Sequence, residues 1–216
     1  MYPLPLLSQH LDIFPLFGEN TTTPPASLDY SVPEFLVIDP RNMESMEEYN
    51  RSLLNNSGAT WAIGGYLEDR SHILTGTHIR EEGRIYHLGI DILFEAKTKL
   101  YNPLDGRVYE SGYEPGDGNY GGYIIIEYIL DTMKFYALYG HLSLDSITKN
   151  TFVKRGEYLA TLGAPEENGN WFPHLHLQVF TGQDLDTWKN RGYCSEKDLS
   201  SIRNFCPDPS FLFRYG

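Results

Sequence analysis

The chain has 216 residues, of which 41% are hydrophobic, 21% charged and 14% aromatic. These values are those of a globular protein with enough apolar material for a core, and the 16 tyrosines favour strands. The formal net charge of -12 argues against nucleic acid as a partner, because phosphate binding depends on clustered Lys and Arg. No stretch approaches the roughly 20 consecutive apolar residues needed to cross a bilayer, so we expect no membrane partner.

The first 17 residues are largely apolar, but three prolines interrupt them and they include no Lys or Arg. A secretory signal begins with positive charge and continues as an unbroken apolar run, so this segment does not fit one. We therefore expect a cytoplasmic protein, with export by a non-classical route left open. The two cysteines, Cys194 and Cys206, are too few for a disulfide framework, and in that compartment we expect reduced thiols.

Two segments precede the main domain. Residues 1–40 are rich in Pro, Thr and Ser and lack a sustained period, which predicts an extended arm lying on another part of the protein. Residues 43–56 place apolar side chains at helical spacing, which predicts a short amphipathic helix. We assign residues 1–60 to this arm and helix, and residues 61–216 to one domain with an irregular C-terminal extension.

From Trp61 onward, short strand-like segments alternate with turns rich in Gly, Pro and Asp. Many short strands at such spacing predict a mainly β fold, with an antiparallel β-sandwich or barrel-sandwich-like core. The predicted strands cover residues 88–94, 107–110, 123–129, 134–139, 158–162 and 175–180.

Two histidines of the last predicted strand, His174 and His176, are separated by a single residue. Residues two apart in a strand project from the same face, about 6.6 Å apart, so both imidazoles point one way while Leu175 and Leu177 point the other. Such a pair suits a metal site in which one imidazole binds the ion and the other faces its open position. A pair of surface histidines on a sheet is the alternative.

His87 and Asp91 could complete such a site only if the chain bends between them. In a straight strand they would share a face but lie about 13 Å apart, too far to hold one ion. Gly89 permits the necessary bend. One carboxylate and two neutral imidazoles make a good ligand set for zinc. A turn aspartate and a strand-edge histidine are the alternative.

His141 follows Gly140 at the predicted end of an aromatic strand, where functional groups often gather. An ordinary turn histidine is the alternative. Each of the three motifs is weak alone, whereas all three in this order within one β region form a specific pattern. The remaining histidines match no motif, and we expect structural or surface roles for them: His10, His72 and His78.

The three motifs read HxxxD from His87, GHL from Gly140 and HLH from His174. In this order they resemble the lysostaphin/LytM-like zinc endopeptidases of metallopeptidase family 23. The resemblance covers about residues 80–182, nearly half of the chain. Three further stretches resemble turn and strand motifs of that family: residues 102–108, 119–126 and 153–163.

This resemblance implies a Zn²⁺ site formed by His87, Asp91 and His176, with His141 and His174 as catalytic histidines that do not bind the metal. It also implies hydrolysis of an amide bond by metal-activated water, in which those two histidines act as general base or oxyanion stabiliser. The implied substrate is a peptidoglycan-type or other short peptide. In a cytoplasmic setting it would be a muropeptide or another small amide.

Two positions depart from the pattern of many relatives, which have a His where this chain has Tyr128 and a Glu where it has Gln178. Neither position binds the metal in the family, so these departures bear on the substrate more than on activity. Stretches at residues 65–70, 166–171 and 206–209 resemble a branch in which similar domains are fused to class-III aminotransferases and small-molecule kinases.

Two other functions fit parts of the sequence. A LytM-like adaptor would bind a partner in the groove without catalysis, yet such proteins lose ligands and all five positions are present here. A lipoyl- or biotinyl-type carrier would need a modifiable Lys in an exposed hairpin, and no Lys occupies a matching turn. For the N-terminal arm, two roles stay open: it crosses the groove and inhibits, or it packs on the sheet and stabilises.

Overall fold

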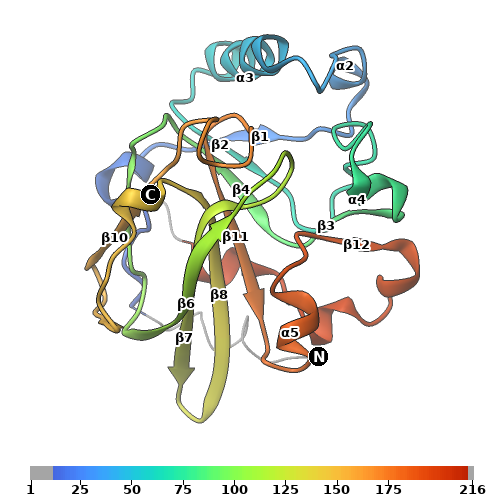
Figure 1. The fold of residues 1–216 in the computed structure, drawn as a ribbon. Coiled ribbons are helices and arrows are strands. Elements are labelled where there is room, and N and C mark those ends of the chain that lie inside the picture. Colours follow the sequence, from blue (N-terminus) through green and yellow to red (C-terminus); the bar gives the residue numbers. More distant parts are fainter. Residues whose placement is uncertain (1–11, 214–216) are drawn as a thin grey trace.

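Strands form most of the regular structure in the computed structural model, which describes residues 12–213 (Figure 1). The strands are β1 (Ala26–Leu28), β2 (Ala62–Gly64), β3 (Arg84–His87), β4 (Ile90–Leu93), β5 (Lys99–Tyr101), β6 (Gly106–Glu114), β7 (Gly121–Leu130), β8 (Met133–Leu142), β9 (Phe152–Val153), β10 (Tyr158–Thr161), β11 (His174–Phe180) and β12 (Tyr193–Ser195). The α-helices are α2 (Pro33–Leu36), α3 (Met43–Ser57), α4 (His78–Glu81) and α5 (Leu185–Trp188). The 3₁₀-helices are η2 (Gly18–Thr21), η3 (Leu144–Ser146), η4 (Glu196–Asp198), η5 (Ile202–Asn204) and η6 (Pro209–Leu212).

Eight strands form one sheet in the order β1-β2-β4-β11-β8-β7-β6-β9. Strands β1 and β2 pair in parallel, and the other neighbouring pairs are antiparallel. Two smaller sheets, β10-β5 and β12-β3, accompany it. The prediction of a mainly β, largely antiparallel fold is therefore confirmed. The sequence did not predict that β12, in the polar C-terminal extension, pairs with β3.

Strand β11 lies at the centre of the large sheet and is buried along its whole length. Leu175 and Leu177 face the main core, which also includes Leu100 and Leu159 of the small β10-β5 sheet. The opposite face is covered by the C-terminal extension, where Cys194 and Cys206 are both buried and free. Covering both faces of β11 removes its side chains from bulk water, and these side chains include the two histidines of the third motif.

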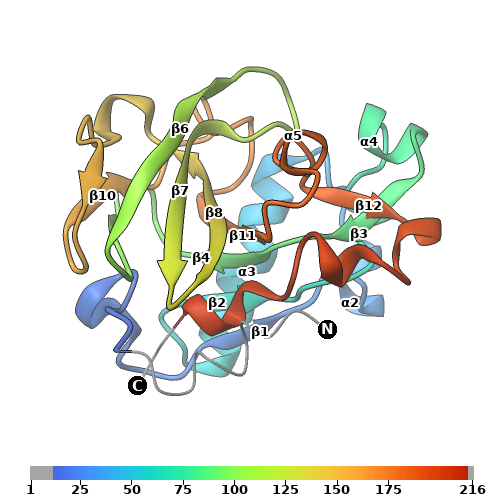
Figure 2. The same cartoon turned by 90° about the horizontal axis from the view of Figure 1, so that it is seen from below.

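The N-terminal segment packs along one edge of the large sheet, where β1 runs beside β2 (Figure 2). The predicted helix is confirmed as α3, which begins after the capping side chain of Asn42 and ends at Gly58 in the left-handed conformation. Its apolar face joins β1 and α2 in a second cluster of buried side chains that includes Leu28, Tyr30 and Phe35. Along the described stretch, none of the helices combines the length and apolarity that crossing a bilayer requires.

Candidate metal centre

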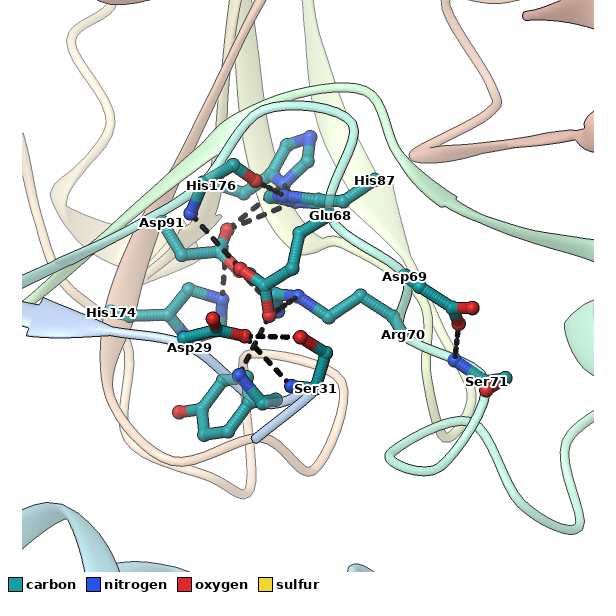
Figure 3. Close-up of polar contacts among 12 residues, drawn as sticks. Asp29, Ser31, Glu68, Asp69, Arg70, Ser71, His87, Asp91, His174 and His176 are labelled. Atoms are coloured by element: carbon teal, nitrogen blue, oxygen red, sulfur yellow. Dashed lines mark hydrogen bonds and ion pairs between the residues drawn. The ribbon is translucent and has the colours of Figure 1, made fainter. Parts of the chain in front are cut away.

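Strands β4 and β11 bring Asp91 and His176 face to face in the middle of the large sheet. Their register places His176 opposite Asp91 on one side and opposite Gly140 of β8 on the other. His87 ends β3, and His141 lies next to the end of β8. The four histidines of the motifs and the aspartate are each at most 5% exposed, so the fold gathers all five predicted site residues into one buried cluster. Figure 3 shows four of them: His87, Asp91, His174 and His176.

The chain bends at Gly89, between the end of β3 and the start of β4 at Ile90. This bend brings His87 Nε2 to 3.3 Å from Asp91 Oδ1. In a straight strand the two residues would be separated by roughly 13 Å along the strand. A β-carbon at Gly89 would lie 2.6 Å from Cε1 of His176. Glycine is therefore required here by the close packing of a site histidine.

Three potential ligand atoms, from His87, Asp91 and His176 (the metal triad), face one another at short distances. Nε2 of His87 lies 3.0 Å from Nδ1 of His176, and these two nitrogens lie 3.3 and 3.2 Å, respectively, from Oδ1 of Asp91. Ligand atoms around a tetrahedral zinc ion, with bonds of about 2.0–2.1 Å, are about 3.3–3.4 Å apart. The triad therefore has the spacing of three corners of such a tetrahedron.

Hydrogen bonds on the far side of each imidazole fix which nitrogen carries the proton. Nδ1–H of His87 donates to the carbonyl oxygen of Gly65 at 3.1 Å, and Nε2–H of His176 donates to Oε1 of Gln178 at 3.0 Å. The orientation of the Gln178 amide follows from its Nε2, which donates to the carbonyl oxygen of Arg191 at 3.1 Å. The two facing nitrogens therefore carry lone pairs, and a lone-pair and carboxylate cluster of this kind fits a metal cation.

Burial and charge set the protonation states of the triad. Burial lowers the pKa of His87 to about 4, so its imidazole is neutral at neutral pH. Burial alone would raise the pKa of Asp91, but the positive charge of the Arg70 guanidinium beside it acts to lower that pKa and favours the ionised carboxylate. The site therefore offers an ionised carboxylate and a neutral imidazole, the forms that bind a divalent cation.

His141 and His174 lie beside the triad, with 4.3 Å between their ring centroids. In both rings Nδ1–H donates to a main-chain carbonyl, that of Asn168 at 2.7 Å for His141 and that of Phe172 at 2.8 Å for His174. Nε2 therefore carries the lone pair in both, and Nε2 of His174 lies 3.6 Å from Oδ1 of Asp91. Burial lowers the pKa of each histidine, so both are neutral proton acceptors at neutral pH.

The site opens into a cleft that aromatic and polar side chains line. Trp171 is one of its lining residues, and the Nε1–H of this side chain is buried and has no hydrogen-bond partner among the described residues. The aromatic lining residues are Tyr120, Trp171, Phe172 and Tyr193, and the polar ones away from the cluster include His78, Arg84, Glu114, Asn119 and Asn190.

The histidines outside the motifs have different positions. His72 has the expected structural role, since its Nε2 lies 2.9 Å from the carbonyl oxygen of Ile38, to which it donates. His78 instead lines the cleft, a position that no sequence motif indicated. His10 lies outside the described residues. None of the described residues 12–57 lines this cleft.

Two residues that support the triad were not predicted as site residues. Gln178 lies two residues after His176 in β11, so strand alternation could have placed its side chain on the same face. Arg70 contacts Asp91 through Nη1 and Oδ2 at 2.9 Å. No spacing rule connects Arg70 with Asp91, because Arg70 lies in an irregular segment before β3. It reaches the site only through the tertiary fold.

A comparison with protein-family models finds a match over the part of the chain that contains these residues. Residues 85–187, just under half of the chain, match the model of Peptidase family M23. The triad and the two further histidines all lie within this match. No curated protein matches the chain significantly.

Several solved structures are similar to part of the chain. A zinc-containing peptidase from Vibrio cholerae is 31% identical over 51% of this chain and 30% of that one, with a TM-score of 0.38. The catalytic domain of a variant of the prophage-encoded M23 protein EnpA from Enterococcus faecalis is 22% identical over 51% of this chain and 75% of that one, with a TM-score of 0.38. The catalytic domain of lysostaphin from Staphylococcus simulans is 21% identical over 53% of this chain and 78% of that one, with a TM-score of 0.39. The chain thus spans less than a third of the length of the Vibrio protein.

Proposed function

We propose that this chain, whose residues 85–187 match the model of peptidase family M23, is a zinc metallopeptidase that hydrolyses an amide bond in a short peptide. The observation that carries the proposal is the metal triad, in which two imidazole lone pairs and a carboxylate oxygen face one another at 3.0 to 3.3 Å. Without a cation these electron-rich atoms repel, and with one they form a site of three protein ligands and an open position, as catalytic zinc requires.

A zinc ion held by the triad would polarise the scissile carbonyl and lower the pKa of a water molecule to about 7. The protein prepares its ligands for this role. Gly65 and Gln178 fix the tautomers of the two imidazoles, and Asp91 keeps Oδ1 toward them while Oδ2 accepts from Arg70. Two neutral ligands and one anionic ligand leave a divalent ion with net positive charge.

We assign the proton transfers to Nε2 of His141 and of His174. Each is a neutral acceptor facing the cleft beside the triad, and each is held by a hydrogen bond from its Nδ1–H. Either can take the proton of the attacking water and, once protonated, stabilise the oxyanion or protonate the leaving amine. His141 also adopts a φ of 61°, a strained conformation of the kind that gathers at functional sites.

The substrate that we infer is a peptidoglycan-derived or other short peptide. The aromatic side chains that line the cleft suit packing against an extended peptide. With the cytoplasmic location that we also propose, the substrate would be a muropeptide or another small amide. The fusion to a class-III aminotransferase or small-molecule kinase, suggested by residues 65–70, 166–171 and 206–209, stays a prediction.

A non-catalytic adaptor that binds a partner in the same groove is the alternative. The complete triad and the two acceptor histidines weigh against it, because an adaptor needs neither bound metal nor proton acceptors. The two functions differ in turnover and not in binding, so a kinetic measurement separates them.

The proposed function is tested by following peptide hydrolysis as zinc is returned to metal-free protein. Peptidoglycan fragments and short glycine- and alanine-containing peptides would be incubated with the protein and their products identified by mass spectrometry. We expect cleavage that rises with zinc until one equivalent is bound, and none with the His141→Ala, His174→Ala double variant. Binding of these peptides by the zinc-loaded protein without any cleavage would favour the adaptor.

A further inference from the structure

A charged side chain is buried directly behind the metal triad. The side chain of Arg70 is 1% exposed, and its Nη1 lies 2.9 Å from Oδ2 of Asp91 (Figure 3). Its Nε lies 2.9 Å from Oε1 of Glu68, in a second ion pair. A buried guanidinium is costly unless its charge is matched, and here two carboxylates match it. Its hydrogen bonds to them run from Nη1 to Oδ2 of Asp91 and from Nη2 to Oε2 of Glu68, at 2.9 and 3.4 Å.

Glu68 in turn connects Arg70 with two other parts of the structure. Its Oε1 accepts from the main-chain N–H of Tyr30 at 2.7 Å, and the guanidinium of Arg70 lies 4.9 Å from the centre of the Tyr30 ring. Its Oε2 accepts from the main-chain N–H of Gly65 at 3.1 Å, and Gly65 is the residue whose carbonyl orients His87. One carboxylate therefore contacts the supports of two metal ligands as well as the N-terminal segment.

The geometry of Arg70 determines which oxygen of Asp91 faces the imidazoles. An aspartate with two free oxygens can rotate or bind a cation through both of them. Because Oδ2 is engaged by Nη1 of Arg70, only Oδ1 remains toward His87 and His176, at 3.3 and 3.2 Å. The guanidinium is planar and presents its donors in fixed directions, so holding it through Glu68 also fixes the rotamer of Asp91.

We propose that Arg70 is a positioning residue of the metal centre, and that Glu68, anchored by the main chain of Tyr30, holds it in place. The N-terminal segment is thereby part of the support of the metal site. This inference rests on the metal-dependent function proposed above. Loss of such supporting contacts weakens metal binding by about 10- to 100-fold in known metal sites, which is the effect we expect here.

Two substitutions separate positioning from charge and from folding. Arg70→Lys keeps the positive charge but replaces a planar, multi-donor group with a single ammonium that cannot hold Glu68 and Asp91 in the same geometry. Glu68→Gln keeps Arg70 and Asp91 but weakens the anchor of the guanidinium. The matched control is Tyr30→Phe, which removes only the hydroxyl that donates to Oδ1 of Asn50 at 3.2 Å and keeps the main-chain donor and the ring.

The measurements are the zinc dissociation constant, by competition with a chelator, and the visible absorption of the cobalt-substituted protein, which reports ligand geometry. Circular dichroism of the metal-free chains checks that they fold. We expect both test variants to fold, to bind zinc about 10- to 100-fold more weakly and to show an altered cobalt spectrum, while Tyr30→Phe binds zinc as the parent does.

Unchanged zinc affinity and an unchanged cobalt spectrum in a folded Arg70→Lys or Glu68→Gln chain would overturn the positioning role. Failure of both variants to fold would overturn it as well, because the network would then serve the fold and not the pose of Asp91. A parent protein that binds no zinc would instead refute the proposed function. None of these readouts depends on finding the peptide substrate.

Discussion

Nε2 of His87 and Nδ1 of His176 face each other at 3.0 Å, and both carry a lone pair because the proton of each ring is donated on its far side. Two such nitrogens beside a carboxylate oxygen are unfavourable in a metal-free protein and favourable around a cation. Metal binding should therefore stabilise the folded chain as well as enable its chemistry.

Zinc should raise the free energy of unfolding. A ligand that binds only the folded state adds about 4 kcal/mol when its free concentration is 1,000 times its dissociation constant, and we expect zinc to do so here. Thermal unfolding with zinc and with a chelator measures the effect. The His176→Ala chain should show no difference between the two conditions, and a zinc-dependent shift of parental size in that chain would place the ion elsewhere.

Gly89→Ala should weaken zinc binding, because the added methyl group would lie 2.6 Å from Cε1 of His176 and displace this ligand. A loss of at least 10-fold in affinity is expected, since misplacing a ligand costs no less than losing one of its supporting contacts. Gly112→Ala in β6 is the matched control, because a β-carbon there would contact only the far end of the Tyr123 side chain, at 3.1 Å from its hydroxyl, and no site residue. Equal zinc dissociation constants for the two variants would contradict the close packing of Gly89 on the site.

His141→Ala and His174→Ala should each keep the zinc and lose about 10²- to 10⁴-fold in hydrolysis rate, the usual effect of removing a positioned acid, base or oxyanion donor. Metal analysis and single-turnover kinetics on the same preparations test both parts of this expectation. Loss of zinc from the His174→Ala chain would show that the roles of the two histidines in β11 are reversed.

Acid should destabilise the metal-free protein. An unfolded histidine has a pKa of about 6.5, whereas burial lowers the pKa of His87 to about 4 in the folded chain. Between these values the unfolded chain binds more protons, so the free energy of unfolding falls as the pH falls, by about 1.4 kcal/mol per pH unit for this group. The lowered pKa values of His141 and His174 act in the same direction.

Denaturant unfolding of the zinc-free chain at pH 7, 6 and 5 measures this dependence. The stability contributed by the neutral form of His87 is fully present above about pH 6.5 and is lost progressively toward pH 4. The His141→Gln chain should show a shallower dependence because one of the contributing groups is gone. Stability that is constant or rises on acidification would show that the buried histidines are not held neutral.

Removal of residues 1–57 should lower the melting temperature and weaken zinc binding without any gain in rate. The truncation removes Leu28, Tyr30 and Phe35 and exposes the apolar surface that they cover. Burial of each of these side chains contributes about 2 kcal/mol to the free energy of unfolding. The truncation also removes the main-chain N–H of Tyr30 that donates to Glu68. Calorimetry, zinc competition and peptide turnover measure the three effects. A folded, truncated chain that cleaves peptide faster than the parent would instead support an inhibitory arm.

The sequence predicted the strands and the helix best where local patterns are strong. Residues 43–56 carry helical spacing and end near Gly58, and α3 was found within one residue of the predicted bounds. Residues 134–139 and 175–180 lie inside β8 and β11. The pairing of β12 with β3 was missed because Tyr193–Ser195 is short and surrounded by polar residues, so only tertiary contact identifies it as a strand.

The residues of the site also fall into two groups, those that local patterns predicted and those that only the tertiary fold brings there. Alternation in β11 correctly predicted that His174 and His176 share a face, and Gly89 indicated a bend that the structure contains. Arg70 was missed because its contact with Asp91 depends on how an irregular segment folds against β4. Sequence spacing identifies groups that share an element, whereas the residues that orient them come from elsewhere in the chain.

The zinc content of the purified protein tests the central claim most directly. Elemental analysis of the parent chain should give one zinc ion per chain, either as isolated or after incubation with zinc and removal of the excess. The His87→Ala, Asp91→Ala and His176→Ala chains, prepared in parallel and shown to be folded, should each give none. A parent chain that neither carries zinc nor takes it up would contradict the account, and so would a folded triad variant that retains a full equivalent.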